Sequence, residues 1–576
     1  MQHDDTLWFE KFRASQSHTS LAERPIAYFC AEYALSDELP IYAGGLGILA
    51  GDYIREAARQ SVPIAAVGLY YSEGFTRKEL SPEGRVVDFH VSRSPEEAGL
   101  VPVLDNLGKP IFVKIPIQEQ SVAVRAWRWT PKTDTGDDST VSVYLLDSHV
   151  PENTETNQHI TDALYATDKE VRLKQEMILG IGGLRLLESL HIHPSIYHLN
   201  EGHSAFLIYE LIHHEMEEHN LTFIEAKERA REHILFTNHT LVAAGNDVFA
   251  DDLVSFTLEK YAEEINVPAK QLVDIGLVQQ SSTFSMTMLA LRAAGKINAV
   301  SKLHATKAKE IWKDHPMFPI TNGIYLPQWD QVKDAQHMWE KHIEQKRKLL
   351  ATIFSQTGTQ WDEREIVLGW ARRIVRYKRP LAMVERLKRF GEMAQNANRP
   401  IRLVFAGQSH PSDGEGEEIL EELQYRLRSD LKGVAVYLPH YNMDLSKQLT
   451  SGCDVWVNTP VVGFEACGTS GMKAALNGVL PLTTRDGWVD EVELFGVGWL
   501  LNDANVTDDI LDILERDILP TYYAKNDQGV PEQWLAMMQN ARALIWNEFS
   551  MTRALRQYLE EGMGIDVGES FDKLRT

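Results

Sequence analysis

The residues with the clearest chemical potential form a glycine-rich stretch, residues 468–478, which reads GTSGMKAALNG. Two glycines and two hydroxyl side chains precede a helical segment, so backbone N–H groups at a helix N-terminus could bind an anion. Lys473 is predicted in the first turn of this helix, among apolar neighbours. Burial and the positive helix end would both disfavour its ammonium form, which leaves the amine ready to form a Schiff base. The alternative is a tight packing turn with a surface lysine, because glycine turns before helices are common.

A second chemical cluster is basic. Residues 372–379 read RRIVRYKR and directly follow a predicted strand. In a chain with a net charge of −24, basic charge concentrated at a strand end indicates a phosphate-binding place. The alternative is a solvated helix start whose cations pair with acidic neighbours. That alternative is weakened because Arg and Lys are unfavourable near a helix N-terminus unless an anion compensates them.

Three further turns offer polar groups at predicted strand ends. The loop 42–47, YAGGLG, could cradle a phosphate, but it matches neither the dinucleotide fingerprint nor the P-loop spacing. Residues 200–203, NEGH, and 238–240, NHT, carry hydrogen-bonding groups suited to sugar hydroxyls. Each of these two turns can equally be a capped turn whose polar groups bond one another.

Two groups of histidines raise the question of a metal site. His214 and His219 flank acidic residues, but they are five residues apart and diverge by about 140° around a helix. His198, Glu201 and His203 straddle a strand end and would meet at a metal only by accident of loop geometry. We therefore predict no metal site. The three cysteines form no C-x-x-C pair, which argues against a disulfide framework and against structural zinc.

The composition limits the class of protein. With 576 residues, 44% apolar and 24% charged, the chain is typical of a soluble globular protein with two large α/β domains or three smaller ones. The acidic net charge excludes a broad surface for nucleic acid or for an anionic membrane. Residues 1–10 are polar and acidic, so we expect no signal peptide, and no apolar run reaches about 18 residues. We expect a cytoplasmic enzyme.

The elements that must position these clusters alternate between strands and helices. In the first half, strands are predicted at 26–30, 62–70, 196–199 and 234–237, with a helix at 48–60. In the second half, strands are predicted at 366–370, 402–406, 434–438 and 455–457, each followed by a helical segment. This alternation indicates parallel sheets covered on both faces, with a proline-rich linker at 315–330. Ligands of such sheets bind beyond the carboxyl ends of the strands, where the polar clusters are predicted to lie.

Taken in order, these clusters resemble the α-glucan phosphorylase family. The resemblance runs from about residue 25 to beyond residue 491. It implies an α/β protein of the GT-B type, with two Rossmann-like doubly wound domains facing each other across a cleft, at 1–325 and 326–576. The stretches that carry it are PIYAGGLGILAGD, LYATDKEVRLKQE, YHLNEGHSAF, FTNHTLVAAGNDVF, ITNGI, WARRIVRYKRP, VFAGQSHP and FEACGTSGMKAALNG.

The resemblance implies pyridoxal 5′-phosphate between the domains, as a Schiff base on Lys473, with its 5′-phosphate beside the substrate phosphate and active in proton transfer. The implied catalytic residues are Lys473, Arg373, Lys378, Arg372, His239 and Glu465. The cofactor would also contact Thr469, Gly468, Ser470, Gly471, Arg372, Gly45 and Tyr441. Substrate would contact Gly44, Gly45, Leu46, His239, Asn322, Glu465, Cys467, Gly468, His203 and Glu201.

The implied reaction is the reversible phosphorolysis of an α-1,4-glucan or maltooligosaccharide from its non-reducing end. Inorganic phosphate is the acceptor and α-glucose 1-phosphate the product, with retention. One alternative is a nucleotide-sugar GT-B glycosyltransferase such as a glycogen synthase. Such enzymes carry two glutamates with seven residues between them, and here Glu465 is followed at that position by Lys473. Another alternative is a catalytically weak family member that serves as a glucan-binding or regulatory protein.

Several positions depart from the family pattern. Cys467 stands where many members have serine, and Arg372 replaces the lysine of muscle-type enzymes. Gln408 replaces a common lysine, and the valines at 461–462 stand where short bacterial members often have arginines. These changes leave the preferred glucan length open. We expect no phosphorylation control in this shorter chain. The region at 505–576 is predicted to be mostly helical and to pack partly on the first domain. Many members of the family are dimers, but this sequence leaves the oligomeric state open.

Overall fold

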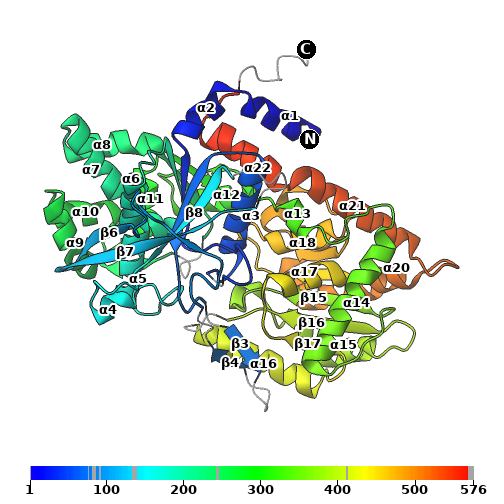
Figure 1. Cartoon of the computed structure of the whole chain (residues 1–576). Helices are drawn as coiled ribbons and strands as arrows, with labels where there is room; N and C mark the ends of the chain where they lie inside the picture. Colours follow the sequence, from blue (N-terminus) through cyan, green and yellow to red (C-terminus); the bar gives the residue numbers. More distant parts are fainter. Residues whose placement is uncertain are drawn as a thin grey trace.

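The structure is a computed structural model that describes residues 2–39, 41–75, 77–80, 86–89, 93–132, 139–241, 246–409 and 413–567. Parts of three stretches quoted above, Pro40, 242–245 and 410–411, lie outside these ranges. Each half of the chain builds one large sheet flanked by helices (Figure 1). Among the described residues, no helix combines the length and the apolar character needed to span a bilayer.

The N-terminal sheet has ten strands, in the order β14-β13-β10-β9-β1-β2-β8-β7-β5, with β6 paired to β7. From β14 to β8 all neighbours are parallel, as the alternating pattern predicts. The prediction of a purely parallel sheet is wrong at one edge, where β5, β6 and β7 pair antiparallel. The strands are β1 (Ile26–Phe29), β2 (Ile64–Leu69), β5 (Val101–Pro102), β6 (Phe112–Ile117), β7 (Gln120–Trp129), β8 (Val141–Asp147), β9 (Ile196–Asn200), β10 (Ile234–Asn238), β13 (Lys296–Ala299) and β14 (Phe318–Pro319).

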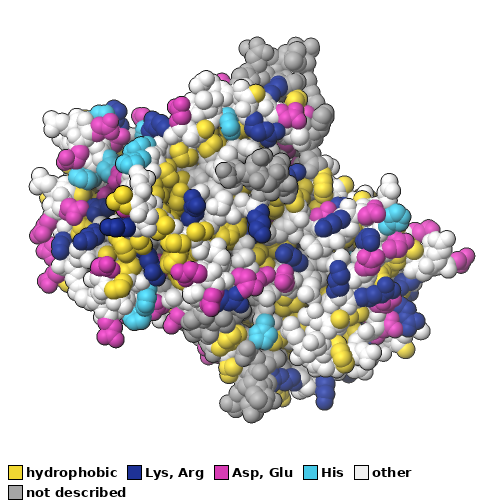
Figure 2. All heavy atoms as spheres, in the orientation of Figure 1, with side chains coloured by type: hydrophobic (Ala, Val, Ile, Leu, Met, Phe, Trp, Pro, Cys, Tyr) yellow, Lys and Arg dark blue, Asp and Glu magenta, His cyan; other side chains and the backbone are white. Residues whose placement is uncertain are grey.

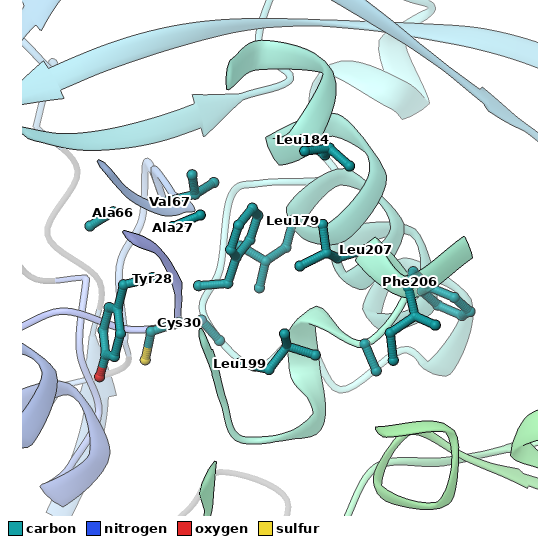
Figure 3. Close-up of a cluster of buried hydrophobic side chains, with 14 of the residues drawn as sticks. Ala27, Tyr28, Cys30, Ala66, Val67, Leu179, Leu184, Leu199, Phe206 and Leu207 are labelled. Atoms are coloured by element: carbon teal, nitrogen blue, oxygen red, sulfur yellow. The ribbon is translucent and has the colours of Figure 1, made fainter. Parts of the chain in front are cut away.

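Complete burial explains why the central strands appear in the sequence as continuous apolar runs. Every residue of β1 and β2 is buried, so neither face of the sheet is exposed to water there. Figure 3 shows Leu199 of β9 next to Leu179 and Leu207, which come from the helical layer on one face. Because β1 lies between β9 and β2, the chain reverses its direction of winding at β1. Loops that follow β1 and β9 therefore leave a crevice at the carboxyl edge.

Helix α3 (Gly45–Arg59) connects β1 to β2 and begins three residues earlier than the predicted 48–60. The N-cap residue, Gly44, has no side-chain cap. Just before the helix, Glu32 Oε2 accepts hydrogen bonds from the backbone N–H groups of Ala43 (2.6 Å) and Gly44 (3.1 Å) and so holds the turn. A Cβ at Gly47 would lie 2.6 Å from the Tyr42 Cβ and 2.8 Å from Glu32 Oε2, so only glycine fits this first turn. The glycine-rich loop is thus the N-terminal turn of a helix.

The C-terminal sheet has six parallel strands in the order β17-β16-β15-β18-β19-β20. Numbered along the chain, this order is 3-2-1-4-5-6, the doubly wound arrangement whose ligands bind between the first and fourth strands. Alternate residues of β15 belong to two different buried clusters, Leu368 and Trp370 to one and Val367 and Ala371 to the other, so both faces are covered. The strands are β15 (Ile366–Ala371), β16 (Ile401–Ala406), β17 (Ala435–Leu438), β18 (Val455–Asn458), β19 (Leu480–Thr484) and β20 (Trp499–Leu501).

The end of the described chain returns to the N-terminal half, as predicted. Helix α22 (Met551–Gln557) contributes Met551, Ala554 and Leu555 to the buried cluster of the N-terminal sheet. It lies beside α1 (Gln2–Arg13) and α3 (Figure 1). On the face drawn in Figure 2, lysine and arginine side chains are interspersed with acidic ones over both halves.

A fully buried ionic cluster joins helix α14 (Met338–Thr357) to the C-terminal sheet. The Asp454 carboxylate accepts hydrogen bonds from Lys346 Nζ (2.6 Å) and the backbone N–H of Val367 (2.7 Å). Its other oxygen lies 3.0 Å from His342 Nε2. Lys346 Nζ also donates to the Tyr522 hydroxyl at 2.9 Å. The ammonium therefore depends on one carboxylate for its compensating charge.

The first prediction concerns this cluster. Asp454→Ala should lower the free energy of unfolding by about 3–5 kcal/mol, because it leaves the Lys346 ammonium buried without its counter-charge. Urea unfolding followed by tryptophan fluorescence and circular dichroism measures the change. The control is Asp274→Ala, which breaks the exposed pair with Lys270 and should cost at most about 1 kcal/mol. Equal losses in the two variants would contradict the structural role of the buried cluster.

Candidate active site

A cavity of about 560 Å³ is lined by residues from both halves of the chain. It lies at the carboxyl ends of the central strands: Glu201 follows β9, His239 follows β10 and Arg372 follows β15. Gly471 is the one predicted site residue that does not line it. The predicted site residues that do line it are Gly44, Gly45, Leu46, Glu201, His203, His239, Asn322, Arg372, Arg373, Lys378, Tyr441, Glu465, Cys467, Gly468, Thr469, Ser470 and Lys473.

Lys473 lies on helix α18 (Thr469–Leu476) and is 3% exposed. Its ammonium nitrogen sits 4.0 Å from the centroid of the Trp329 ring. Burial lowers the pKa of Lys473 to about 8. Two parts of the prediction need correction: the lysine is in the last turn of the helix, not the first, and the C-terminal end of a helix favours an ammonium. Burial rather than the helix end makes this amine easy to deprotonate.

Asp52 of α3 is the nearest compensating charge for Lys473, and the sequence analysis missed it. Its carboxylate accepts hydrogen bonds from Trp329 Nε1 (2.8 Å) and from the backbone N–H of Tyr325 (3.1 Å). Burial raises the pKa of Asp52 to about 6, and the nearby Lys473 opposes that rise. One indole thus contacts both the carboxylate and the amine. An aspartate inside the otherwise apolar run ILAGDYI was the signal that could have identified it.

The basic cluster surrounds one carboxylate. Arg372 Nη2 donates a hydrogen bond to Glu465 Oε2, and Lys378 Nζ lies 3.6 Å from the same oxygen. Burial together with the Arg372 guanidinium lowers the pKa of Lys378 to about 7. Burial alone would raise the pKa of Glu465, but Arg372 and Lys378 hold it below its usual value. The predicted helix does not follow β15 directly; a short 3₁₀ turn, Arg376–Lys378, takes its place. Lys378 of this turn lines the cavity, whereas the Arg376 side chain is exposed.

Four buried polar atoms of the lining have no hydrogen-bond partner among the described residues. They are Arg372 Nη1, Asn322 Oδ1, Ser409 Oγ and His203 Nδ1. Buried polar groups are almost always paired, so unpaired ones that line a cavity are available to a polar ligand or to water. The guanidinium nitrogen among them can donate to an anion, and the amide oxygen can accept from a hydroxyl.

The glycine turn presents backbone to this cavity. A Cβ added at Gly44 or Gly45 would meet no atom within 4 Å, so these positions face open space rather than packed side chains. The Glu32 carboxylate that caps the turn also accepts a hydrogen bond from the Tyr165 hydroxyl at 2.8 Å. Glu32 and Tyr165 both line the cavity, although the sequence analysis gave neither a role. Backbone N–H groups at this edge can therefore approach a bound ligand closely.

The two polar turns of the N-terminal sheet meet each other. Glu201 Oε2 accepts a hydrogen bond from the backbone N–H of His239 (2.8 Å), and Asn200 Oδ1 accepts one from His239 Nε2 (2.7 Å). Because Nε2 carries the proton in that bond, Nδ1 is the acceptor of the His239 ring. Burial lowers the pKa of His239 to about 3 and raises that of Glu201 to about 7. The imidazole is therefore neutral, which suits a hydroxyl partner better than an anion.

An ionic network in the lining of the cavity was also missed. The Arg172 guanidinium lies over the Tyr165 ring at 4.6 Å and donates to Asp247 Oδ2 at 2.7 Å. His203 Nε2 lies 3.3 Å from the same oxygen. Arg172 and Tyr165 belong to the stretch LYATDKEVRLKQE, which carried the resemblance without an assigned role. Their partner Asp247 is 75 residues away along the chain, so no local pattern could reveal the network.

The first residues of helix α18 differ in whether they line the cavity. Gly468 is the N-cap with φ 84°, a left-handed conformation that favours glycine. Thr469 and Ser470, the first two helical residues, line the cavity. Gly471 is buried instead against Trp488: a Cβ there would lie 3.3 Å from Trp488 Nε1. The role of Gly471 in the structure is close packing.

The departures Gln408 and Cys467 both line the cavity. Burial raises the pKa of the Cys467 thiol, so it remains protonated at neutral pH. Phe464 also lines the cavity and is 48% exposed, and its ring centroid lies 6.0 Å from that of Tyr377. The lining thus has an aromatic, partly exposed side next to the basic cluster.

Comparison with known proteins identifies the family of this chain. The family model described as carbohydrate phosphorylase matches residues 324–527. Maltodextrin phosphorylase of Thermococcus litoralis is 33% identical over 94% of this chain and 70% of its own length. Glycogen phosphorylase of Mycobacterium tuberculosis is 31% identical over 96% of this chain and 72% of its own length, and that of Aquifex aeolicus is 30% identical over 94% and 86%. By these relatives, the chain belongs to the carbohydrate phosphorylase family.

Proposed function

We propose that this protein catalyses the reversible phosphorolysis of α-1,4-glucans or maltooligosaccharides from the non-reducing end. Inorganic phosphate is the acceptor and α-glucose 1-phosphate the product. The observation that carries the proposal is one cavity, lined from both halves of the chain, that combines the buried amine of Lys473, the basic cluster at 372–378 and unpaired polar atoms. Relatives named maltodextrin phosphorylase and glycogen phosphorylase support the substrate class.

Pyridoxal phosphate fits the residues of this cavity. It needs an amine that loses its proton near neutral pH, and burial gives Lys473 such a pKa. It also needs donors for a phosphate, and the lining offers Arg372 Nη1 and the N-terminal turn of α18 with Thr469. When bound, the cofactor supplies a phosphate that can exchange a proton with a neighbouring anion. Lys473 would hold it covalently, with Arg372, Thr469 and the glycine turn around it.

The protein's own cations would stabilise the substrate phosphate. Glu465 Oε2 occupies Arg372 Nη2 and attracts Lys378, which leaves Arg372 Nη1 unpaired. This nitrogen has two N–H donors, so one could serve the cofactor phosphate and the other the substrate phosphate. A phosphate near Lys378, whose pKa is about 7, would favour its ammonium form and so increase the positive charge when phosphate binds. Fixed donors of this kind stabilise developing negative charge without reorganising.

The sugar would be held by the neutral groups on the other side of the cavity. His239 Nδ1 and Asn322 Oδ1 can accept hydrogen bonds from sugar hydroxyls, and Glu201 fixes His239 through its backbone. Cys467, 4% exposed, would contribute through its backbone or its weak S–H donor. A neutral binding face beside a cationic one matches a substrate pair made of an uncharged glucan and phosphate.

The same proposal includes the architecture. We assign residues 1–325 and 326–576 to two Rossmann-like domains of a GT-B arrangement that closes around the cavity. Support comes from the two doubly wound strand orders and from lining residues on either side of residue 325. We assign the reaction to the cytoplasm.

The second prediction tests the reaction. With maltooligosaccharide and inorganic phosphate, the protein should release glucose 1-phosphate in proportion to chain shortening, and none without phosphate. Arg372→Met should raise the KM for phosphate about 10–100-fold, because a charge-assisted hydrogen bond of about 1.5–3 kcal/mol is lost, and Arg372→Lys should recover part of the loss. The matched control is Arg376→Met, whose side chain is exposed and pairs with Glu415. Transfer from a nucleotide sugar, or an unchanged phosphate KM in Arg372→Met, would contradict the proposal.

The third prediction concerns the proton on Lys473. The Asp52 carboxylate favours the ammonium, so Asp52→Asn should lower the lysine pKa further below its ordinary value. The rate at which cofactor-free protein takes up pyridoxal phosphate, followed by visible absorbance, rises with the neutral amine. Its pH midpoint should therefore move to lower pH in the variant. Asp105→Asn, an exposed aspartate in the same half, should leave the midpoint in place. A midpoint that stays or rises in Asp52→Asn would exclude Asp52 as the counter-charge.

A further inference from the structure

Three potential metal ligands meet on the surface beside the N-terminal sheet, outside the cavity. A ring nitrogen of His149, a ring nitrogen of His159 and a carboxylate oxygen of Asp162 all lie within 4.8 Å of one another. Both histidines are exposed and Asp162 is half-buried. None of the three lines the cavity. The prediction of no metal site rested on other histidines, His214 with His219 and His198 with His203, and did not consider this group.

A buried clamp holds the two ends of the loop that carries these ligands. Ser148 and Thr161, the chain neighbours of His149 and Asp162, bond each other reciprocally: Ser148 N–H donates to Thr161 Oγ1 (3.1 Å) and Thr161 N–H to Ser148 Oγ (3.2 Å). The two hydroxyls lie 3.1 Å apart, and both residues are at most 1% exposed. The ligands are thus brought together by buried backbone and side-chain bonds rather than by chance contact of flexible side chains.

Hydrogen bonds from neighbouring residues also fix the position of the Asp162 carboxylate. Asp162 Oδ1 accepts a hydrogen bond from Ser72 Oγ at 2.9 Å, while Oδ2 lies 2.6 Å from His159 Nδ1. The backbone carbonyl of Asp162 accepts from the N–H of Glu73 at 2.8 Å. A serine that holds a ligating carboxylate is the kind of outer contact that tunes metal sites.

We propose that His149, His159 and Asp162 form a binding site for a divalent transition metal such as zinc, with water completing four-coordination. Tetrahedral ligands at zinc stand about 3.3 Å apart, so binding would adjust to that spacing three ligand atoms that already lie within 4.8 Å of one another. Two imidazoles and one carboxylate suit zinc, copper or nickel, whereas calcium and magnesium need more oxygen ligands. Binding through His159 Nδ1 would replace the contact between this atom and Asp162 Oδ2.

A bound metal would affect the conformation of the segment 162–165 and would take no part in the reaction in the cavity. The chain continues from Asp162 to Leu164, whose N–H donates to the carbonyl of Gly74 (3.0 Å), and to Tyr165, whose hydroxyl donates to Glu32. A metal would therefore stiffen the segment that presents Tyr165 to the cavity. This inference is independent of the proposed reaction, because its ligands take no part there.

The fourth prediction uses zinc alone as the probe. Chelator-treated full-length protein should bind one zinc at this site and gain thermal stability, measured by equilibrium dialysis with elemental analysis and by thermal melting. Ser72→Ala removes only an outer contact and should weaken zinc binding about 10–100-fold. His149→Ala and Asp162→Asn each remove a ligand and should weaken it more, at least about 100-fold.

The control is His193→Ala, an exposed histidine of the same half, which should bind zinc as the wild type does. The side chain of His149 is exposed, so His149→Ala should retain the circular dichroism of the folded protein. Wild-type protein that binds no zinc, or zinc binding unchanged in His149→Ala and Asp162→Asn, would overturn the site.

Discussion

The Lys473 ammonium nitrogen lies 4.0 Å above the Trp329 ring, and the Trp329 N–H is bonded to Asp52 from the other half of the chain. Removing an ammonium from water is costly, and one buried carboxylate offsets only part of that cost. The amine therefore loses its proton near neutral pH. Because the carboxylate comes from α3 and the amine from α18, the proton affinity of Lys473 depends on both halves being packed together.

The two sheets impose the second constraint. Each winds outward from a central strand, β1 in one sheet and β15 in the other, so that each leaves a crevice at its carboxyl edge. The cations follow β15, and the neutral hydrogen-bonding turns follow β9 and β10. Opposite chemistries thus reach one cavity from opposite sheets. In the proposed function, the cations after β15 would bind phosphate and the turns after β9 and β10 would bind the sugar.

Sequence reasoning identified what depends on local pattern. Fully buried parallel strands such as β1 and β2 appear as apolar runs, and the clusters around Lys473 and Arg372 stand out by composition, so both could be predicted. The antiparallel edge of the N-terminal sheet, the last-turn position of Lys473, and partners such as Asp52 could not. Their identification requires knowing which distant segments pack together, as Asp247 and Arg172 show. The departures at Gln408 and Cys467 proved to be lining residues, which position along the chain alone does not establish.

The central claim is that the buried amine of Lys473 carries pyridoxal phosphate. Borohydride reduction of the purified protein, followed by peptide mapping with mass spectrometry, tests it directly. The account predicts one pyridoxyl group per chain, on the peptide that contains Lys473, and none there in a Lys473→Arg variant. The absence of an adduct after incubation with pyridoxal phosphate, or an adduct confined to another lysine such as Lys378, would contradict it.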